Sequence, residues 1–129
     1  MPEFTVPEQP GQRCRVTFPL LAAHGTQDCA SVYFELRVGD FLGTHTDSAE
    51  EILYIVEGEV EVTVGEETGT LSKGHLALVP KLMPHNVRNI GRQTAKVLGF
   101  FGGANNVVSV FDNVWQPSAS NRVDTSEIV

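Results

Sequence analysis

Residues 39–58 read GDFLGTHTDSAEEILYIVEG, and residues 74–89 read GHLALVPKLMPHNVRN. Each stretch begins at a glycine and sets side chains of the types that bind metals beside a short apolar run. His45 and Asp47 are two residues apart, so on an extended strand their side chains point to the same face. Glu51 opens the next apolar run, in which alternate residues face inward together. The pattern predicts side chains that converge from neighbouring strands.

The second stretch supplies a further imidazole, that of His85. It follows Pro80 and Pro84, residues that can end one strand and fix the loop from which the next strand begins. Imidazole and carboxylate groups that arrive from three adjacent strands of a closed sheet are a way to build an open metal site. The candidate ligands are therefore His45, Asp47, Glu51 and His85.

Outward from these stretches, the chain alternates short apolar segments with turns. In Glu59–Val64 the valines fall on one face and the polar residues on the other, as in a half-buried strand, and Ser31–Val38 alternates likewise. Runs rich in β-branched or aromatic residues predict three more strands: Ile52–Val56, His75–Val79 and Ala95–Phe101. Residues Val107–Phe111 follow a turn and predict a final strand or an extended segment packed on the barrel. Turn residues separate the segments about every eight to twelve positions, a spacing typical of a sandwich or barrel. Long helical patterns are absent, so the fold class is all-β.

The length of 129 residues and the hydrophobic content of 41% suit a single domain around one core. The proline-rich start predicts an extended N-terminal arm over residues 1–12. Residues 13–116 would form the barrel. The polar end of the chain predicts a loosely held C-terminal tail over residues 117–129.

Charge and composition exclude several classes of partner. The formal net charge is −7 and the nine lysines and arginines are scattered, so a nucleic-acid partner is not expected. No apolar run is long enough to cross a bilayer and the first residues lack the pattern of a signal peptide, so we expect a cytoplasmic protein that does not bind membranes. Cys14 and Cys29 lack a paired motif and are expected to be free thiols.

The two stretches resemble the paired motifs of the cupin superfamily, G-x5-H-x-H-x3,4-E-x6-G and G-x5-P-x-G-x2-H-x3-N. The positions that match at the family spacing are Gly39, His45, Glu51, Gly58, Gly74, Pro80, His85 and Asn89. The resemblance implies a small single-domain cupin with a jelly-roll β-barrel. It also implies that His45, Glu51 and His85 bind a divalent metal.

Two positions depart from the family motifs. Asp47 stands in place of the second histidine of the first motif, where it can bind the metal directly, bind it through water, or stay free beside the open positions as a general base. Leu82 stands where the second motif has a glycine. A glycine there can adopt a backbone angle that leucine resists.

The ligand chemistry narrows the choice of metal. If Asp47 binds, two carboxylates offset the charge of a dication, which favours harder ions such as manganese or iron. If Asp47 does not bind, His45, Glu51 and His85 form a set of two histidines and one carboxylate, which suits iron and oxygen chemistry. Zinc, nickel and copper are the alternative ions.

The resemblance implies a metal-dependent enzyme that acts on a small organic molecule in the barrel. Oxygenation of the dioxygenase type is the leading hypothesis, with Asp47 and Glu51 as the catalytic groups that move protons. The same site could run isomerase, lyase or decarboxylase chemistry by stabilising an enolate. The alternative of another class is a cupin that binds a small molecule without catalysis.

Other residues receive simpler interpretations. His24 and His75 lack matching partners and are expected to be surface or hydrogen-bonded histidines, and Tyr54 should point away from Glu51. Core packing or a place in the pocket wall is expected for four apolar residues: Phe41, Met83, Phe100 and Phe101. A homodimer is expected, because the chain is small, similar cupins pair their sheets, and one strand has an apolar face. That face consists of Val32, Phe34, Leu36 and Val38.

Overall fold

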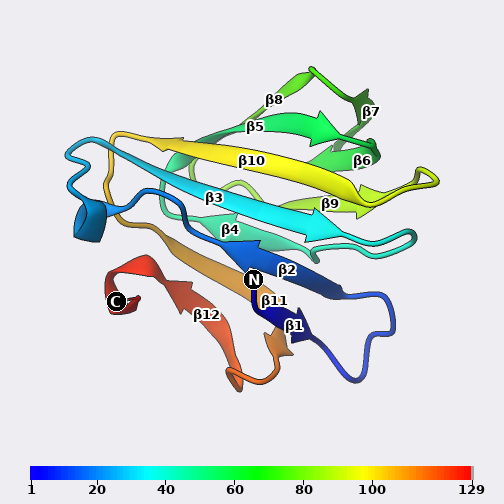
Figure 1. Ribbon diagram of the computed structural model, residues 1–129, viewed down its shortest axis with the longest axis horizontal. Coiled ribbons are helices and arrows are strands. Elements are labelled where there is room, and N and C mark those ends of the chain that lie inside the picture. The colour runs from blue at the N-terminus through cyan, green and yellow to red at the C-terminus, as the bar shows by residue number, and fades with distance from the viewer. Residues whose placement is uncertain (129) are drawn as a thin grey trace.

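Alternating apolar and polar residues fold the chain into two six-stranded antiparallel sheets that face each other (Figure 1). The computed structural model describes residues 1–128. The first sheet has the order β1 (Glu3–Thr5), β2 (Arg13–Thr17), β3 (Cys29–Leu36), β10 (Ala95–Gly102), β5 (Glu50–Glu57) and β8 (Leu76–Val79). The second has the order β12 (Ser120–Asp124), β11 (Val108–Trp115), β4 (His45–Asp47), β9 (His85–Asn89), β6 (Glu59–Val64) and β7 (Glu67–Ser72). The expected all-β jelly roll is confirmed.

The described residues contain two single-turn 3₁₀ helices, η1 (Ala22–His24) and η2 (Thr125–Glu127), and no α-helix. No helix among them is long and apolar enough to cross a bilayer. The predicted strand Glu59–Val64 has the bounds of β6, and the other predicted strands overlap β3, β5, β8, β10 and β11. The thiols of Cys14 and Cys29 are both free, as expected.

The apolar side chains of β3 form part of the core. Val32, Phe34 and Leu36 are at most 8% exposed, because they point between the two sheets. Val38 lies beyond the end of β3 and is exposed. The predicted dimer face on this strand is therefore wrong. Alternation shows that one side of a strand is apolar, but it does not show whether that side packs in the chain's own core or against a second chain. Here the apolar side packs in the core.

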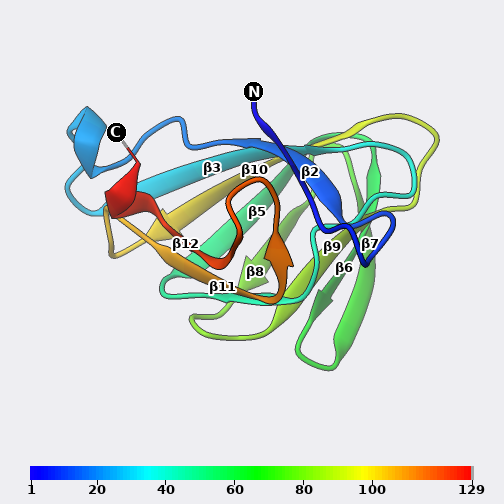
Figure 2. The ribbon, with the colours of Figure 1, turned by 90° about the horizontal axis from the view of Figure 1, so that it is seen from below.

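Both ends of the chain join the barrel. Thr5 of β1 exchanges two backbone hydrogen bonds with Gln116, at 2.9 and 2.7 Å, which link the edge of the first sheet to the second. Figure 2 shows β12 running beside β11. The expectation of a loosely held tail is therefore corrected for residues 117–128, because backbone pairing and the buried Thr125 hold them. Val129, the last residue of the expected tail, lies outside the described residues.

Candidate metal centre

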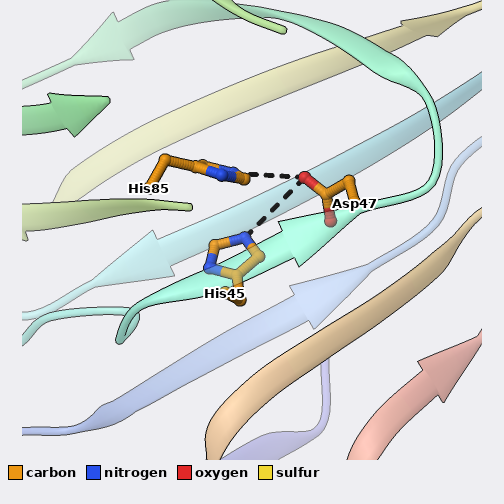
Figure 3. A group of neighbouring side chains, drawn as sticks. All are labelled: His45, Asp47 and His85. Atoms are coloured by element: carbon orange, nitrogen blue, oxygen red, sulfur yellow. Dashed lines mark ion pairs between the residues drawn. The ribbon is translucent and has the colours of Figure 1, made fainter. Parts of the chain in front are cut away.

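Three polar side chains of the second sheet meet inside the barrel (Figure 3). His45 and Asp47 come from β4, and His85 lies opposite His45 in the register between β4 and β9. Asp47 Oδ2 is 3.1 Å from His85 Nε2 and 3.8 Å from His45 Nε2. All three residues are at most 5% exposed. One ligand atom from each lies within 4.8 Å of the others, which is close enough for a shared ion.

Backbone carbonyls orient both imidazole rings. His45 Nδ1 lies 2.8 Å from the carbonyl oxygen of Gly43, and His85 Nδ1 lies 2.9 Å from that of Met83. Because only an N–H can donate to a carbonyl, Nδ1 is the protonated nitrogen in each contact. Each Nε2 is thereby left facing the cluster, the arrangement in which an outer hydrogen bond fixes a metal-binding tautomer.

The fourth predicted residue, Glu51, reaches the cluster from the opposite sheet, so the expectation that all ligands come from adjacent strands is wrong for this residue. It lies on β5, and its Oε1 is 3.6 Å from His85 Nε2. The neighbouring strand β10 makes room for it with Gly99, because a Cβ at that position would overlap Glu51 Oε2. Glu51 therefore borders the compact group of His45, Asp47 and His85, and the structure brings all four candidates together.

A serine that the sequence did not reveal holds Asp47 in place. Ser109 of β11 lies opposite Asp47 in the strand register, and its hydroxyl donates a hydrogen bond of 2.5 Å to Asp47 Oδ1. This bond leaves Oδ2 directed at the two histidines. Ser109 is 62 residues from Asp47 along the chain and belongs to no motif, so only the pairing of β11 with β4 identifies it.

Unsatisfied polar atoms test whether the cluster fits a cation. Asp47 Oδ2 and His85 Nε2 are buried and lie 3.1 Å apart, and in this orientation neither makes a hydrogen bond with any of residues 1–128. Buried polar atoms of this kind are costly unless something pairs with them. A divalent ion bound by two imidazoles and a carboxylate would satisfy both atoms, so the residues fit a metal.

The cluster opens onto an interior cavity of about 290 Å³. The His45 ring stacks on Phe111 with centroids 4.3 Å apart, and Phe111 meets the edge of Trp115 at 5.3 Å. Apolar side chains form most of the remaining wall: Phe4, Val16, Phe18, Val32, Phe34, Leu42, Leu53, Val87, Phe101 and Val123. The cavity thus joins the polar cluster to a mostly apolar wall, and Arg122, Asp124 and Glu127 of the C-terminal segment also contribute to its lining.

A family model described as the cupin domain matches residues 32–101, more than half of the chain. The chain belongs to the cupin family. The matched span contains all four candidate ligands, which confirms the resemblance found in the two motifs.

Comparison with known proteins places this cupin among diverse relatives. An uncharacterised protein of Methanocaldococcus jannaschii is 37% identical over 51 residues, which are 40% of this chain and 41% of that protein. The solved cupin domain of Cnp3 from Schizosaccharomyces pombe is similar with a TM-score of 0.63 and 18% identity, over 70% of this chain and 64% of that one. The chain thus spans less than two thirds of each of these two proteins.

Two solved enzymes share the fold at 21% identity. Oxalate decarboxylase from Bacillus subtilis has a TM-score of 0.69, over 84% of this chain and 29% of the enzyme. The DMSP lyase DddQ from Ruegeria pomeroyi has a TM-score of 0.68, over 77% of this chain and 51% of the enzyme. Likeness at this level of identity establishes the cupin fold and leaves the reaction open.

The charges of the cupin cluster are strongly coupled. Burial lowers the pKa of His45 to about 4, so this ring is neutral near pH 7. Burial also opposes charge on His85, but contacts with Asp47 and Glu51 outweigh it and raise the pKa of His85 to about 10. The metal-free cluster therefore holds a cationic imidazole between two acidic side chains, at the place where a metal would supply positive charge instead.

The two carboxyl groups titrate differently. Burial acts to raise the pKa of Asp47, but its contacts with His85, His45 and Ser109 outweigh burial and lower that pKa. Burial raises the pKa of Glu51 to about 7, and the nearby charge of Asp47 adds to the effect. Asp47 is thus held as an anion, whereas Glu51 can hold or release a proton near neutral pH.

The other sequence interpretations have mixed outcomes. Tyr54 points away from Glu51 as expected, and Phe101 is buried in the cavity wall. Phe100 is instead 48% exposed, because alternation along β10 turns it outward. His24 and His75 each accept a backbone N–H through Nδ1, from Leu21 and Ser72 respectively.

Leu82 adopts the backbone conformation that a glycine would favour. Its φ is +62°, in the left-handed region, and its amide donates to the Asp47 carbonyl oxygen at 2.9 Å. The loop before His85 therefore keeps a left-handed residue at this motif position, although leucine makes that conformation more costly.

Proposed function

We propose that this cupin is a metal-dependent oxygenase of a small, mostly apolar molecule bound in the barrel. The observation that carries the proposal is the cluster of His45, Asp47 and His85, with two buried polar atoms that lack partners. Two histidines and one carboxylate beside an open cavity are the ligand set of many non-haem iron oxygenases.

The three cluster residues would hold a ferrous or manganous ion, with Asp47 as the carboxylate ligand. A bound iron ion would supply the activation of dioxygen and an attachment point for a substrate oxygen. Hydrogen bonds from the two imidazoles to backbone carbonyls, and from Ser109 to Asp47, keep the ligand atoms in position.

Glu51 is the proposed proton-transfer group. It borders the cluster at 3.6 Å from His85 without belonging to the compact ligand set. In the metal-free cluster burial raises its pKa to about 7, and a bound dication would favour the carboxylate, the form that accepts a proton. It would take a proton from a hydroxyl or an activated carbon of the substrate and return it after the chemical step.

The apolar wall sets the proposed substrate class. Phe111 stacks on His45, and Phe34, Leu53 and Phe101 line the adjoining space. Such a wall excludes water and favours an apolar body that carries one or two oxygen donors at the metal end. A compound with an aromatic or aliphatic body and adjacent hydroxyl or carbonyl oxygens matches a cavity that is apolar along its wall and polar at the metal end.

Redox-neutral lyase or decarboxylase chemistry is the second candidate function. Glu51 favours it, because a carboxyl group that titrates near neutral pH can protonate a carbanion or enolate directly. The similar oxalate decarboxylase of Bacillus subtilis has Mn(II) centres, and manganese suits the same oxygen- and nitrogen-containing ligands.

Oxygen uptake separates the two functions. Protein stripped of metal and reloaded with iron or manganese would be supplied with apolar compounds that bear adjacent oxygen donors. Uptake of dioxygen that depends on iron and is lost in Asp47→Ala supports the oxygenase. Product formation without oxygen uptake supports the second candidate. Ligand binding without turnover of any compound, with either metal, would contradict both and leave a non-catalytic binding protein.

A further inference from the structure

A buried side chain of the N-terminal arm holds the segment that leads into β4. Gln12 lies just before β2 and is only 1% exposed, although it is polar. It packs against Leu42 and Gly43, and His45 follows at the start of β4 (Figure 3). We propose that Gln12 is a positioning residue for His45, which keeps the imidazole in the orientation and tautomer that bind a metal. The inference rests on the proposed function, in which His45 is a metal ligand.

Two side chains clamp the peptide group between Leu42 and Gly43. Gln12 Nε2 donates a hydrogen bond of 3.2 Å to the Leu42 carbonyl oxygen. From the other side, the Gly43 amide donates a hydrogen bond of 2.8 Å to Asn86 Oδ1. The carbonyl group of one residue and the amide of the next belong to one rigid plane, so the two bonds together fix the rotation of a single peptide unit.

The next carbonyl group along the chain orients the imidazole. Gly43 O accepts a hydrogen bond of 2.8 Å from His45 Nδ1, and only the φ and ψ angles of Gly43 separate this carbonyl from the clamped peptide. The proton on Nδ1 leaves the lone pair of Nε2 free for a metal. Without the clamp, Gly43 O can turn away, and the ring can instead carry its proton on Nε2, which lies 3.8 Å from Asp47 Oδ2. A proton there blocks the metal.

Gly43 needs this support more than another residue would. Its φ is +98°, which glycine tolerates, but glycine also has the widest conformational freedom and so holds the angle weakly. A Cβ at this position would overlap Gln12 Nε2, so the arm fills the space of the missing side chain. Gln12 therefore supplies the rigidity that the glycine lacks.

Other contacts fix Gln12 itself. Asn113 of β11 donates a hydrogen bond of 2.8 Å to Gln12 Oε1, and the amide of Val6 donates one of 3.0 Å to the Gln12 carbonyl oxygen. The side-chain amide is thus oriented with its oxygen toward β11 and its nitrogen toward Leu42. The same strand β11 carries Phe111, which stacks on His45. The arm and β11 together hold both the ring and the backbone that orients it.

The tautomer of His45 in the metal-free protein tests the inference. The chain has four histidines, so nuclear magnetic resonance of isotope-labelled protein can assign the nitrogens of each ring. At pH 7 the wild type should carry the His45 proton on Nδ1. Gln12→Met keeps the side-chain volume but cannot donate, so it should give a mixture of both tautomers. Thr125→Val is the matched control, because it removes buried hydrogen bonds with Val107 and Asn106 that do not involve this segment. It should keep the wild-type tautomer.

The affinity for manganese gives a second readout. Gln12→Met should lower it about tenfold, at the lower end of the effect of outer contacts, because Gln12 acts through a backbone carbonyl. Thr125→Val should bind manganese as the wild type does. Competition with a chelator measures both variants.

The other half of the clamp gives a test that does not depend on how a Gln12 variant folds. Asn86→Ala removes the acceptor of the Gly43 amide and should give the same mixture of tautomers at His45. Asn86→Asp keeps an oxygen at that position and should restore the single tautomer.

The outcomes separate this inference from the proposed function. A single Nδ1 tautomer in Gln12→Met or in Asn86→Ala, or a mixture in Thr125→Val or in Asn86→Asp, would overturn the inference. So would equal manganese affinity of Gln12→Met and a wild type that binds the ion. A wild type that binds no metal would contradict the proposed function, and the tautomer in the metal-free protein would still decide whether Gln12 positions His45.

Discussion

The two sheets hold their acidic side chains at the metal centre in different ways. On the second sheet, Asp47 is fixed by a hydrogen bond from Ser109 and lies at 3.1 Å from His85. On the first sheet, Glu51 sits over Gly99 and accepts no hydrogen bond from a side-chain hydroxyl among residues 1–128. Burial therefore dominates at Glu51 and raises its pKa, whereas direct contacts dominate at Asp47 and lower its pKa. The difference supports the proposed roles, a metal ligand on one sheet and a proton carrier on the other.

Replacing each acid in turn should give the largest effects, on metal affinity in one case and on turnover in the other. Asp47→Ala removes a ligand, so we expect metal affinity to fall by more than about a hundredfold, beyond the usual effect of losing an outer contact. Glu51→Gln should keep the metal but lower turnover by about 10²–10⁴-fold, as is typical of lost proton transfer. Elemental analysis and steady-state kinetics measure the two effects. Equal metal loss in both variants would show that the two acids share one role, and the exposed His75→Ala should change neither quantity.

The pH dependence of metal affinity should sharpen the distinction. A proton on His85, whose pKa is raised to about 10, competes with the metal, so affinity should fall about tenfold per unit as pH drops from 9 to 7. Below pH 7 the fall should steepen, because a dication favours the ionised form of Glu51, whose pKa in the metal-free cluster is about 7. Titration calorimetry at several pH values measures this profile. Glu51→Gln should remove only the steepening, and an unchanged profile in that variant would contradict the assignment of the second proton.

The hydrogen bond from Ser109 should account for part of the affinity. Ser109→Ala frees Asp47 to rotate and should lower metal affinity by about 10–100-fold, the usual effect of losing a partner that orients a ligand. Ser118 is a suitable control, since it lines the same cavity but its hydroxyl donates to the Trp115 carbonyl oxygen. Competition with a metal chelator measures both variants. Similar affinity in the wild type and Ser109→Ala would show that burial alone positions Asp47.

The space beneath Glu51 should be sensitive to a single methyl group. Gly99→Ala would place a Cβ against Glu51 Oε2 and 2.9 Å from Val32 Cγ1, so it should destabilise the metal-free protein by about 1–3 kcal/mol. Gly102→Ala is the control on the same strand, because a Cβ there would meet nothing within 4 Å. Urea unfolding measures both. Equal stability of the two variants would mean that Glu51 and Val32 can move aside freely.

The smallest expected effect is at the loop that precedes His85. Leu82→Gly should stabilise the protein by up to about 1 kcal/mol, because relief of the left-handed backbone exceeds the entropy cost of glycine. Leu82→Ala keeps the same backbone cost and should leave the stability within about 0.5 kcal/mol of the wild type. Thermal unfolding distinguishes the two. A loss of stability in Leu82→Gly would show that the leucine side chain compensates for its backbone.

The fold and the four candidate ligands could be predicted from the sequence because both depend on local spacing. The two-residue period placed Tyr54 on the face of its strand that points away from Glu51. The spacing of the motifs placed His45 and His85 on strands that pair. Leu82 was identified in the same way, as a leucine where the motif needs a glycine, and its φ of +62° explains that need.

What the sequence could not provide depends on which strands pair and which faces turn outward. Ser109 and Gly99 act on Asp47 and Glu51 through pairing and packing between strands far apart in the chain. Residues such as Val32 and Ile52 are both apolar, yet the first faces the core and the second faces out. Composition alone does not distinguish an apolar residue buried within one chain from one available to another chain.

The stacked aromatic rings beside the cluster would allow tryptophan fluorescence to report the binding of a metal ion. Trp115 is the only tryptophan in the sequence, so indole emission comes from one position. Its ring meets Phe111, which stacks directly on His45. Ions with partly filled d shells quench indole fluorescence at such short range, whereas zinc, with a filled shell, does not. The emission of the unlabelled protein should therefore report both when an ion binds and whether its d shell is partly filled.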